Sequence, residues 1–397
     1  MMKLRTLLYW VFGIGCLALG LSGCVEEYNA DISSDDSNLL VVEGTICSGM
    51  QNKFYLSRTQ AINTYNSPKA VTGATLSVRG SDGSEYKTQA ADGCYTCQID
   101  ALDPDVEYYL HIEADGEVYE SEPQKPLRTE KIADVMGMQD TPESNIDVLV
   151  TPAEPFDPDK VNYYSWTYEE TWEVRPDYIT SLYYDTKLLK PVVKSHLYPE
   201  RGWKDEAGTT VTVGASQSYE GQHIRRLKMY DIDRGNERMF YKYSGLVHQR
   251  AISKAEYEYE LARRQAGLEM GGLFTPLPSA LPTNIHCLTS KKHVIGYVGC
   301  ALNTSHYRFF LMPKDFSIKR PEWKDTRRWI DNPSPEACCN LIEEGLLLCE
   351  WSSDKMSPEG VPIVQTAWAY NYQLDIRRRG AYTEEPDYWS LEENISY

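Results

Sequence analysis

Alternation of apolar and polar residues is the feature that most limits how this chain can fold. From Asn162 to Val174, one side of the segment is mostly aromatic or aliphatic, and the other side carries mainly hydroxyl and carboxylate groups. A period of two residues puts alternate side chains on opposite faces of an extended strand. The segment therefore predicts a long strand whose apolar face covers a core with Tyr164, Trp166, Tyr168, Trp172 and Val174.

Shorter alternating runs near the start of the chain predict a β-sandwich. Turn residues such as Asp92-Gly93 and Asp115-Gly116 separate these runs, and Asp-Gly pairs supply the positive φ angles of hairpin turns. The segment from Glu122 to Pro126 then breaks the pattern, because proline cannot donate a hydrogen bond to a strand ladder. We expect an immunoglobulin-like β-sandwich over residues 38–130, with strands at 40–46, 74–78 and 106–112.

One helix is predicted in the rest of the chain. Ser253 and Glu256 form a capping-box pattern, in which the serine hydroxyl accepts from the Glu256 amide and the carboxylate reaches back to the Ser253 amide. Apolar residues then recur with helical spacing until Gly267. The chain is therefore expected to be mainly β, with residues 131–397 forming a larger β-rich domain that carries one helix near 253–267.

The N-terminal segment has the pattern of a bacterial lipoprotein signal. Lys3 and Arg5 precede an apolar run, and small residues lead directly to Cys24. We expect residues 1–23 to be a cleaved signal peptide and Cys24 to carry lipid; an uncleaved anchor helix is the alternative. The acidic residues that follow cannot bury apolar surface, so 24–37 is expected to be a flexible tether.

The net charge and the cysteines further limit the partners and the compartment. A formal net charge of −18 repels nucleic acid and anionic lipid, so the acyl chain and not a basic patch is expected to hold the protein to a membrane.

Eight cysteines follow Cys24, an even number that in an exported chain predicts disulfides. Spacing makes Cys287 with Cys300, and Cys338 or Cys339 with Cys349, the possible pairs.

Motifs of catalysis are absent from the sequence. It has no Gly-x-Ser-x-Gly elbow, no His-Glu-x-x-His helix and no phosphate loop, and its histidines and cysteines fit no zinc template. We therefore assign no catalytic residue, no metal site and no cofactor. The 29 Tyr and 9 Trp either form a recognition surface or fill sheet faces, where such residues are common.

One irregular loop is the candidate for contact with a ligand or partner. It follows the predicted helix and is rich in glycine and proline, which also have a plainer explanation in loop geometry. The candidate contact residues are Gly271, Gly272, Phe274, Pro276 and Asn284.

Short motifs follow one another in a particular order after the signal. The front half contains Leu40–Gly44, Tyr55–Thr59, Val71–Val78 and Tyr108–Leu110, and the back half contains Gly271–Phe274, Pro282–Ile285, Val294–Tyr297, Gly380 and Pro386–Trp389. In this order they resemble the Bacteroidota lipoproteins called domain-of-unknown-function family 4249. One departure is Gln373–Ile376, where such proteins often have Cys-x-x-Cys; Cys338, Cys339 and Cys349 could replace that bridge.

The resemblance implies an outer-membrane lipoprotein that works beside a TonB-dependent transporter. Glu26 and Glu27 resemble the acidic signal that exports such lipoproteins to the cell exterior. The expected function is therefore a non-catalytic accessory or binding subunit of a nutrient uptake system, with a small molecule, glycan or peptide as ligand. The alternatives are an envelope hydrolase acting on glycan or peptide, and a structural or adhesive surface protein.

Overall fold

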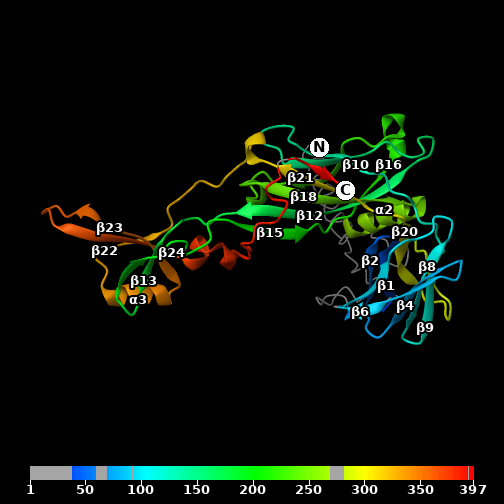
Figure 1. Cartoon of the computed structure of the whole chain (residues 1–397), viewed down its shortest axis with the longest axis horizontal. Helices are drawn as coiled ribbons and strands as arrows, with labels where there is room; N and C mark the ends of the chain where they lie inside the picture. The colour runs from blue at the N-terminus through cyan, green and yellow to red at the C-terminus, as the bar shows by residue number, and fades with distance from the viewer. Residues whose placement is uncertain (1–37, 60–68, 92, 269–280, 392) are drawn as a thin grey trace, which may run out of the picture.

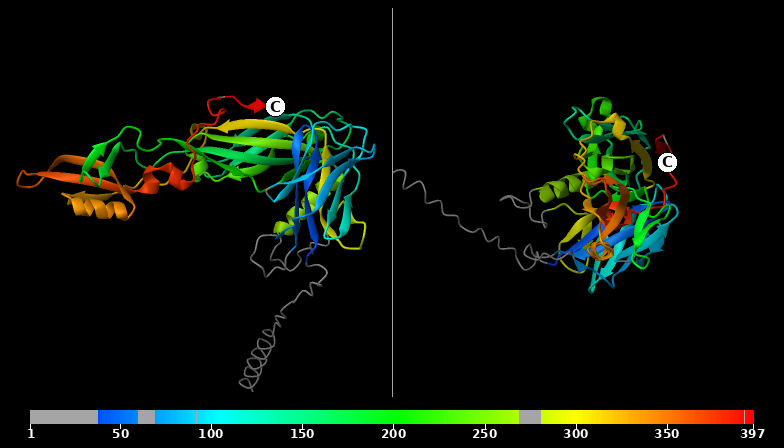
Figure 2. Two further views of the ribbon diagram at one scale, coloured as in Figure 1. Left: turned by 60° about the horizontal axis from the view of Figure 1, so that its bottom comes forward. Right: turned by 90° about the vertical axis from the view of Figure 1, so that its left-hand side faces the viewer.

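The chain folds into three β-rich units arranged along an elongated molecule. The computed structural model describes residues 38–59, 69–91, 93–268, 281–391 and 393–397. A β-sandwich lies at one end, a central unit with two sheets follows it, and a smaller distal unit projects from the opposite end (Figures 1 and 2). The prediction of a mainly β chain with an N-terminal sandwich is confirmed.

The sandwich consists of two sheets packed face to face. The first has the order β20-β1-β2-β7-β6, with β3 paired to β2, and the second has the order β19-β9-β8-β4-β5. Phe54, Val78 and Leu110 are fully buried between them. The strands are β1 (Leu40–Cys47), β2 (Met50–Arg58), β3 (Lys69–Ala70), β4 (Thr75–Gly80), β5 (Glu85–Lys87), β6 (Gln89–Ala91), β7 (Cys94–Ile99), β8 (Tyr108–Ala114), β9 (Glu117–Ser121), β19 (Ile285–Cys287) and β20 (Val294–Ala301).

Two strands of the sandwich come from a later part of the chain than 38–130. β20 pairs in parallel with β1, from Leu40 opposite Val294 to Cys47 opposite Ala301, and β19 pairs with β9. All but one residue of β20 are buried, because one face meets the sandwich core and the other meets the central unit. A strand that is buried on both faces has a continuous run of apolar residues instead of an alternation. The sequence of such a strand therefore does not indicate which strand it pairs with.

The central unit is built around the long strand that the alternation predicts. Its large sheet has the order β15-β12-β18-β21-β25 with β16 beside β12, and its small sheet has the order β10-β11-β17. Trp166 of β12 is fully buried in the core between them. The strands are β10 (Ile132–Met138), β11 (Ile146–Pro152), β12 (Tyr163–Val174), β15 (Gly202–Ala207), β16 (Thr212–Ala215), β17 (Leu227–Ile232), β18 (Tyr243–Ile252), β21 (Ser305–Leu311) and β25 (Ile395–Ser396).

The polar face of β12 is covered over much of its length. Ser165 is buried where the sandwich approaches, and Thr171 is buried beneath Tyr388, whose hydroxyl lies 3.0 Å from the threonine oxygen. Glu173 is also buried and bonds to Arg201 at 3.1 Å. The alternation therefore gives the orientation of each side chain correctly, but it does not reveal that much of the polar face is also buried.

The distal unit combines two segments far apart in the sequence, residues 176–200 and 322–375. Its sheet has the order β22-β24-β23, and the β13–β14 hairpin packs beside it. Trp368 is fully buried and lies 6.2 Å from the ring of Tyr184. The elements are β13 (Leu182–Asp185), β14 (Lys190–Val193), β22 (Arg328–Asp331), α3 (Pro335–Glu343), β23 (Leu346–Met356), β24 (Pro362–Tyr370) and α4 (Asn371–Leu374).

The long helix α2 (Lys254–Leu268) directly follows β18 and lies where the sandwich meets the central unit (Figure 1). One half of the predicted capping box forms, since the Ser253 hydroxyl accepts from the Glu256 amide at 3.1 Å, whereas the Glu256 carboxylate binds Arg250 and not the Ser253 amide. Short 3-10 turns complete the fold at Ser216–Ser218, Glu220–Gln222, Glu237–Met239, Pro313–Asp315 and Ile376–Arg379. Among the described residues, no helix combines the length and apolar character needed to cross a bilayer.

Candidate binding site

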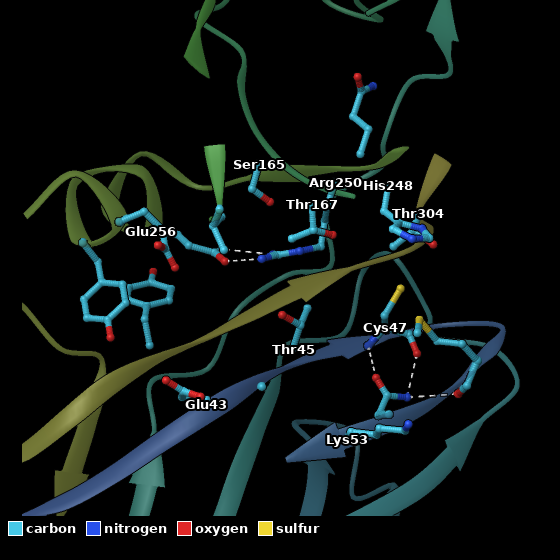
Figure 3. Close-up of a pocket in the computed structure, with 18 of the residues that line it drawn as sticks. Glu43, Thr45, Cys47, Lys53, Ser165, Thr167, His248, Arg250, Glu256 and Thr304 are labelled. Atoms are coloured by element: carbon cyan, nitrogen blue, oxygen red, sulfur yellow. Dashed lines mark hydrogen bonds and ion pairs between the residues drawn. The ribbon is translucent and has the colours of Figure 1, made fainter. Parts of the chain in front are cut away.

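A pocket of ≈ 620 Å³ lies at the seam between the sandwich and the central unit. We call it the seam pocket (Figure 3). The sandwich supplies one wall from β1 and β2, the central unit supplies the other from β12 and β18, and α2 and β21 complete the lining. Its main polar residues are Glu43, Thr45 and Lys53 on the sandwich side and Ser165, Thr167 and Arg250 on the central side.

An ion pair between Arg250 and Glu256 joins β18 to the first turn of α2. Arg250 Nη1 donates to Glu256 Oε2 at 3.1 Å, and Nη2 bonds to Oε1 in a second, parallel contact (Figure 3). Only 16% of the arginine side chain and 6% of the glutamate side chain are exposed. Burial by itself lowers the pKa of Arg250, but the Glu256 carboxylate more than offsets this, and the pKa is held above its usual value.

Gly299 makes the space that this ion pair occupies. A Cβ atom at this position of β20 would lie 2.5 Å from both Arg250 Nη1 and Glu256 Oε2. A carbon atom at this distance would overlap both polar atoms, so any side chain would displace one partner. The glycine therefore allows the guanidinium and carboxylate to lie flat against the backbone of the sandwich sheet.

Two histidines on adjacent strands lie in direct contact at the pocket. His248 of β18 and His306 of β21 approach with their Nδ1 atoms 2.7 Å apart. His248 Nε2 lies 3.5 Å from Glu169 Oε1, and His306 Nε2 lies 3.0 Å from Thr304 Oγ1. These contacts are all satisfied if His306 donates from Nδ1 and His248 donates from Nε2 to Glu169. Burial lowers the pKa of both rings, and His306 lowers that of His248 further, so neutral imidazoles are favoured.

The inner face of α2 adds an aromatic pair and a second ion pair. Tyr259 is buried and its ring lies 5.7 Å from that of Tyr297 on β20. Burial raises the pKa of Tyr259 to about 12, so its hydroxyl keeps its proton at physiological pH. One turn further along, Arg263 bonds to Glu260 at 2.7 Å. This face of the helix is thus neutral overall, with aromatic surface beside paired charges.

Several polar groups that face the pocket have no partner among the described residues. The Thr45, Ser165 and Thr167 hydroxyls form no hydrogen bond there, and Lys53 forms no ion pair there (Figure 3). Glu43 lies exposed on the same sandwich strand as Thr45. Unpaired hydroxyls with one ammonium and one carboxylate can bind a small polar molecule through hydrogen bonds.

Of the five residues expected to contact a ligand or partner, the structure describes only Asn284. Gly271, Gly272, Phe274 and Pro276 lie outside the described residues, as does Cys24. Asn284 is buried, and its side-chain amide exchanges two hydrogen bonds of 2.9 Å with the backbone of Val298. Asn284 therefore attaches the start of β19 to β20, and it does not line the seam pocket.

The expected disulfides are wrong, because all eight described cysteines are free thiols. Cys287 and Cys300 lie on strands of different sandwich sheets, and burial raises the pKa of Cys300 to about 12. Cys338 and Cys339 lie on α3, whereas Cys349 faces the opposite side of β23 in another apolar cluster. Closeness in sequence did not bring these sulfur atoms together, because strands and helices turn them to different faces.

One charged residue of the pocket carried a signal in the sequence, and two others did not. Glu256 could be found because the capping box places it on the first turn of a helix. Arg250 and His248 fall on the polar positions of β18, where charged residues are expected on any solvated face. Among the described residues, no group of three or more His, Cys, Asp or Glu side chains is placed to hold a metal ion.

The model of one protein family matches most of the chain. It is described as a domain of unknown function, DUF4249, and it matches residues 25–306. The chain belongs to the DUF4249 family. In this DUF4249 protein the matched residues contain every strand of the sandwich and most strands of the central unit, and the late motifs at Gly380 and Pro386–Trp389 lie beyond them.

Other comparisons add little to the family assignment. No curated protein matches the DUF4249 chain. Among solved structures, trypsin-activated alpha-2-macroglobulin from Escherichia coli is 9% identical, with a TM-score of 0.18, and covers 55% of this chain and 15% of its own. A DUF4785 family protein from Legionella pneumophila is 12% identical, with a TM-score of 0.17, over 53% of this chain and 52% of its own. At these scores neither structure supports a statement about function.

Proposed function

We propose that the protein is a surface-exposed outer-membrane lipoprotein that acts as a non-catalytic binding subunit of a TonB-dependent nutrient uptake system. The observation that supports this most is the seam pocket, with its unpaired hydroxyls and Lys53 between the sandwich and the central unit. Pockets that bind small molecules usually occupy about 300–1,000 Å³ and often lie between domains. The pocket at ≈ 620 Å³ is within that range.

The geometry of the pocket favours binding over hydrolysis. A glycosidase needs two carboxylates at a defined separation, one of them free to donate a proton. Glu256 and Glu260 are each held by a guanidinium, so neither is free for that role. Turnover of glycans or peptides by the purified protein would overturn the non-catalytic assignment.

Blocking the pocket tests the binding role directly. Thr45→Trp would fill the space between the walls, and Thr75→Trp, at an exposed strand position in the other sandwich sheet, is the matched control. We expect the first variant to lose the small molecules that the purified protein releases on denaturation, as detected by mass spectrometry, and the second to keep them. Equal release from both variants would refute the pocket as the binding site.

Extraction of the lipid-bearing protein from its own membrane tests its place in an uptake system. Mass spectrometry should find an acylated Cys24 as the first residue, and a transporter subunit should purify with the chain. A free thiol at Cys24 would remove the lipoprotein assignment. Absence of a co-purifying transporter, together with growth that does not depend on the gene, would favour the structural or adhesive alternative.

A further inference from the structure

Exposed apolar side chains concentrate on the distal unit. Of the 18 large hydrophobic residues that are exposed in the described chain, ten belong to residues 176–200 and 322–375. Isolated exposed hydrophobic residues are common and need no explanation, but a concentration on one projecting unit indicates a contact surface. The unit lies at the end of the molecule opposite the sandwich (Figure 2).

The turn of the β13–β14 hairpin presents two of these residues, one of them in an unfavourable backbone geometry. Leu188 and Leu189 are 59% and 51% exposed, and Leu189 has a φ of 53°. Glycine or asparagine takes that conformation at lower cost than a bulky residue. Asp185 Oδ1 accepts from the amides of Lys187 and Leu188 at 2.8 and 2.9 Å, which fixes the turn. The hairpin therefore does not need leucine at its tip for its own stability.

Lysines flank the two leucines. Lys187 and Lys190 lie on either side of them, and Lys194 follows just after β14. None of the three forms an ion pair with another described residue, and all three are exposed. Although the whole chain carries a net charge of −18, charges more than about 8 Å away are largely screened at physiological salt. Lys194 lies at the base of the hairpin, so Lys187 and Lys190 together with Asp185 give the tip a net charge of +1, and an approaching surface meets a local positive charge.

The shape of the tip distinguishes between the surfaces that it could contact. A stable protein interface buries about 800 Å² on each partner, which a convex turn of four residues cannot supply. A bilayer accepts a convex apolar tip, with leucine side chains among the acyl chains and lysine ammonium groups at the phosphates. We propose that the β13–β14 tip inserts into the interface of an anionic lipid bilayer.

Vesicle binding tests the proposal with the chain from Val25 onward, which lacks the leader and lipid but keeps every described residue. Co-sedimentation would be measured on phosphatidylcholine vesicles with and without phosphatidylglycerol. Leu188→Asn with Leu189→Asn should lower the partition coefficient about tenfold or more, because both apolar anchors are removed. Asparagine suits a positive φ, so this variant should fold at least as well as the parent.

Charge and position are tested by two further variants. Lys187→Gln with Lys190→Gln should weaken binding about tenfold on the anionic vesicles and leave binding to neutral vesicles unchanged. Met356→Asn with Val361→Asn is the matched control, because both residues are 60% exposed at the other hairpin of the same unit. Its binding should equal that of the parent.

Several outcomes would overturn the proposal. Absence of parental binding to anionic vesicles would do so, as would equal binding of the parent and the double leucine variant. If the leucine substitutions instead abolished co-purification of a transporter, the tip would be a protein contact and not a lipid contact. The seam pocket and its ligand are independent of every one of these results.

Discussion

Replacement of Glu256 by alanine should destabilise the seam by about 3–5 kcal/mol, because it leaves a buried guanidinium without its carboxylate. Arg250 is only 16% exposed, and it would lose two charge-assisted hydrogen bonds to Glu256 at once. Removing both charges avoids the unpaired cation. The double variant Arg250→Met, Glu256→Leu should therefore recover most of the loss.

Urea unfolding of the full chain, followed by tryptophan fluorescence and circular dichroism, would measure these changes as shifts of the transition midpoint. Glu258→Ala is the control on the same helix and should change little, since Glu258 is exposed and, among the described residues, pairs with Lys254 alone, at 3.5 Å. Two results would refute the reasoning that breaking this buried ion pair destabilises the protein: a small loss of stability for Glu256→Ala, or a double variant as unstable as the single variant.

Three other substitutions or conditions give further expected outcomes. Gly299→Ala should lower the melting temperature by several degrees in differential scanning calorimetry, because its Cβ would lie 2.5 Å from both partners of the ion pair. Gly345→Ala is the comparison, because a Cβ at Gly345 meets no atom within 4 Å and the only strain there comes from the positive φ of 85°. Lowering the pH from 7 to 5 should destabilise the protein. In the unfolded chain the histidines take up protons near their ordinary pKa of 6.5, whereas in the fold the pKa values of His248 and His306 are lower. The urea midpoint of His306→Asn should therefore depend less on pH than that of the parent. Iodoacetamide should modify Cys287 first and Cys300 only after unfolding. Burial opposes ionisation of Cys287, but hydrogen bonds with Ser290 and Thr289 hold its pKa below the usual value, whereas burial raises the pKa of Cys300 to about 12. Detection of a disulfide between the two residues by mass spectrometry would contradict this prediction.

Local patterns allowed much of the fold to be predicted. The alternation from Tyr164 to Val174 gave β12, and the Ser253 cap gave the start of α2, because both depend only on residues close in sequence. The partner of β1 could not be predicted, because β20 follows more than 240 residues later. Since β20 is buried on both faces, its sequence does not indicate which strand it pairs with or in which register. The distal unit was missed for a related reason, since its two segments become a core only after Tyr184 and Trp368 meet.

The candidate site was harder to predict than the strands. Its walls come from different units, so no contiguous motif contains them, and Arg250 looks like an ordinary solvated residue until α2 supplies Glu256. The disulfide expectation failed because spacing along the chain says nothing about which face of β23 carries Cys349.

The parallel pairing of β1 with β20 also determines when the sandwich can form. Residues up to 121 supply nine of its strands, but the first sheet ends at β1 and the second at β9 until the segment from 285 to 301 arrives. A growing chain therefore exposes two open sheet edges while the central strands are still being synthesised. Such edges attract other strands and invite aggregation, so correct folding requires that the early strands be kept apart from other chains until the last two have been added.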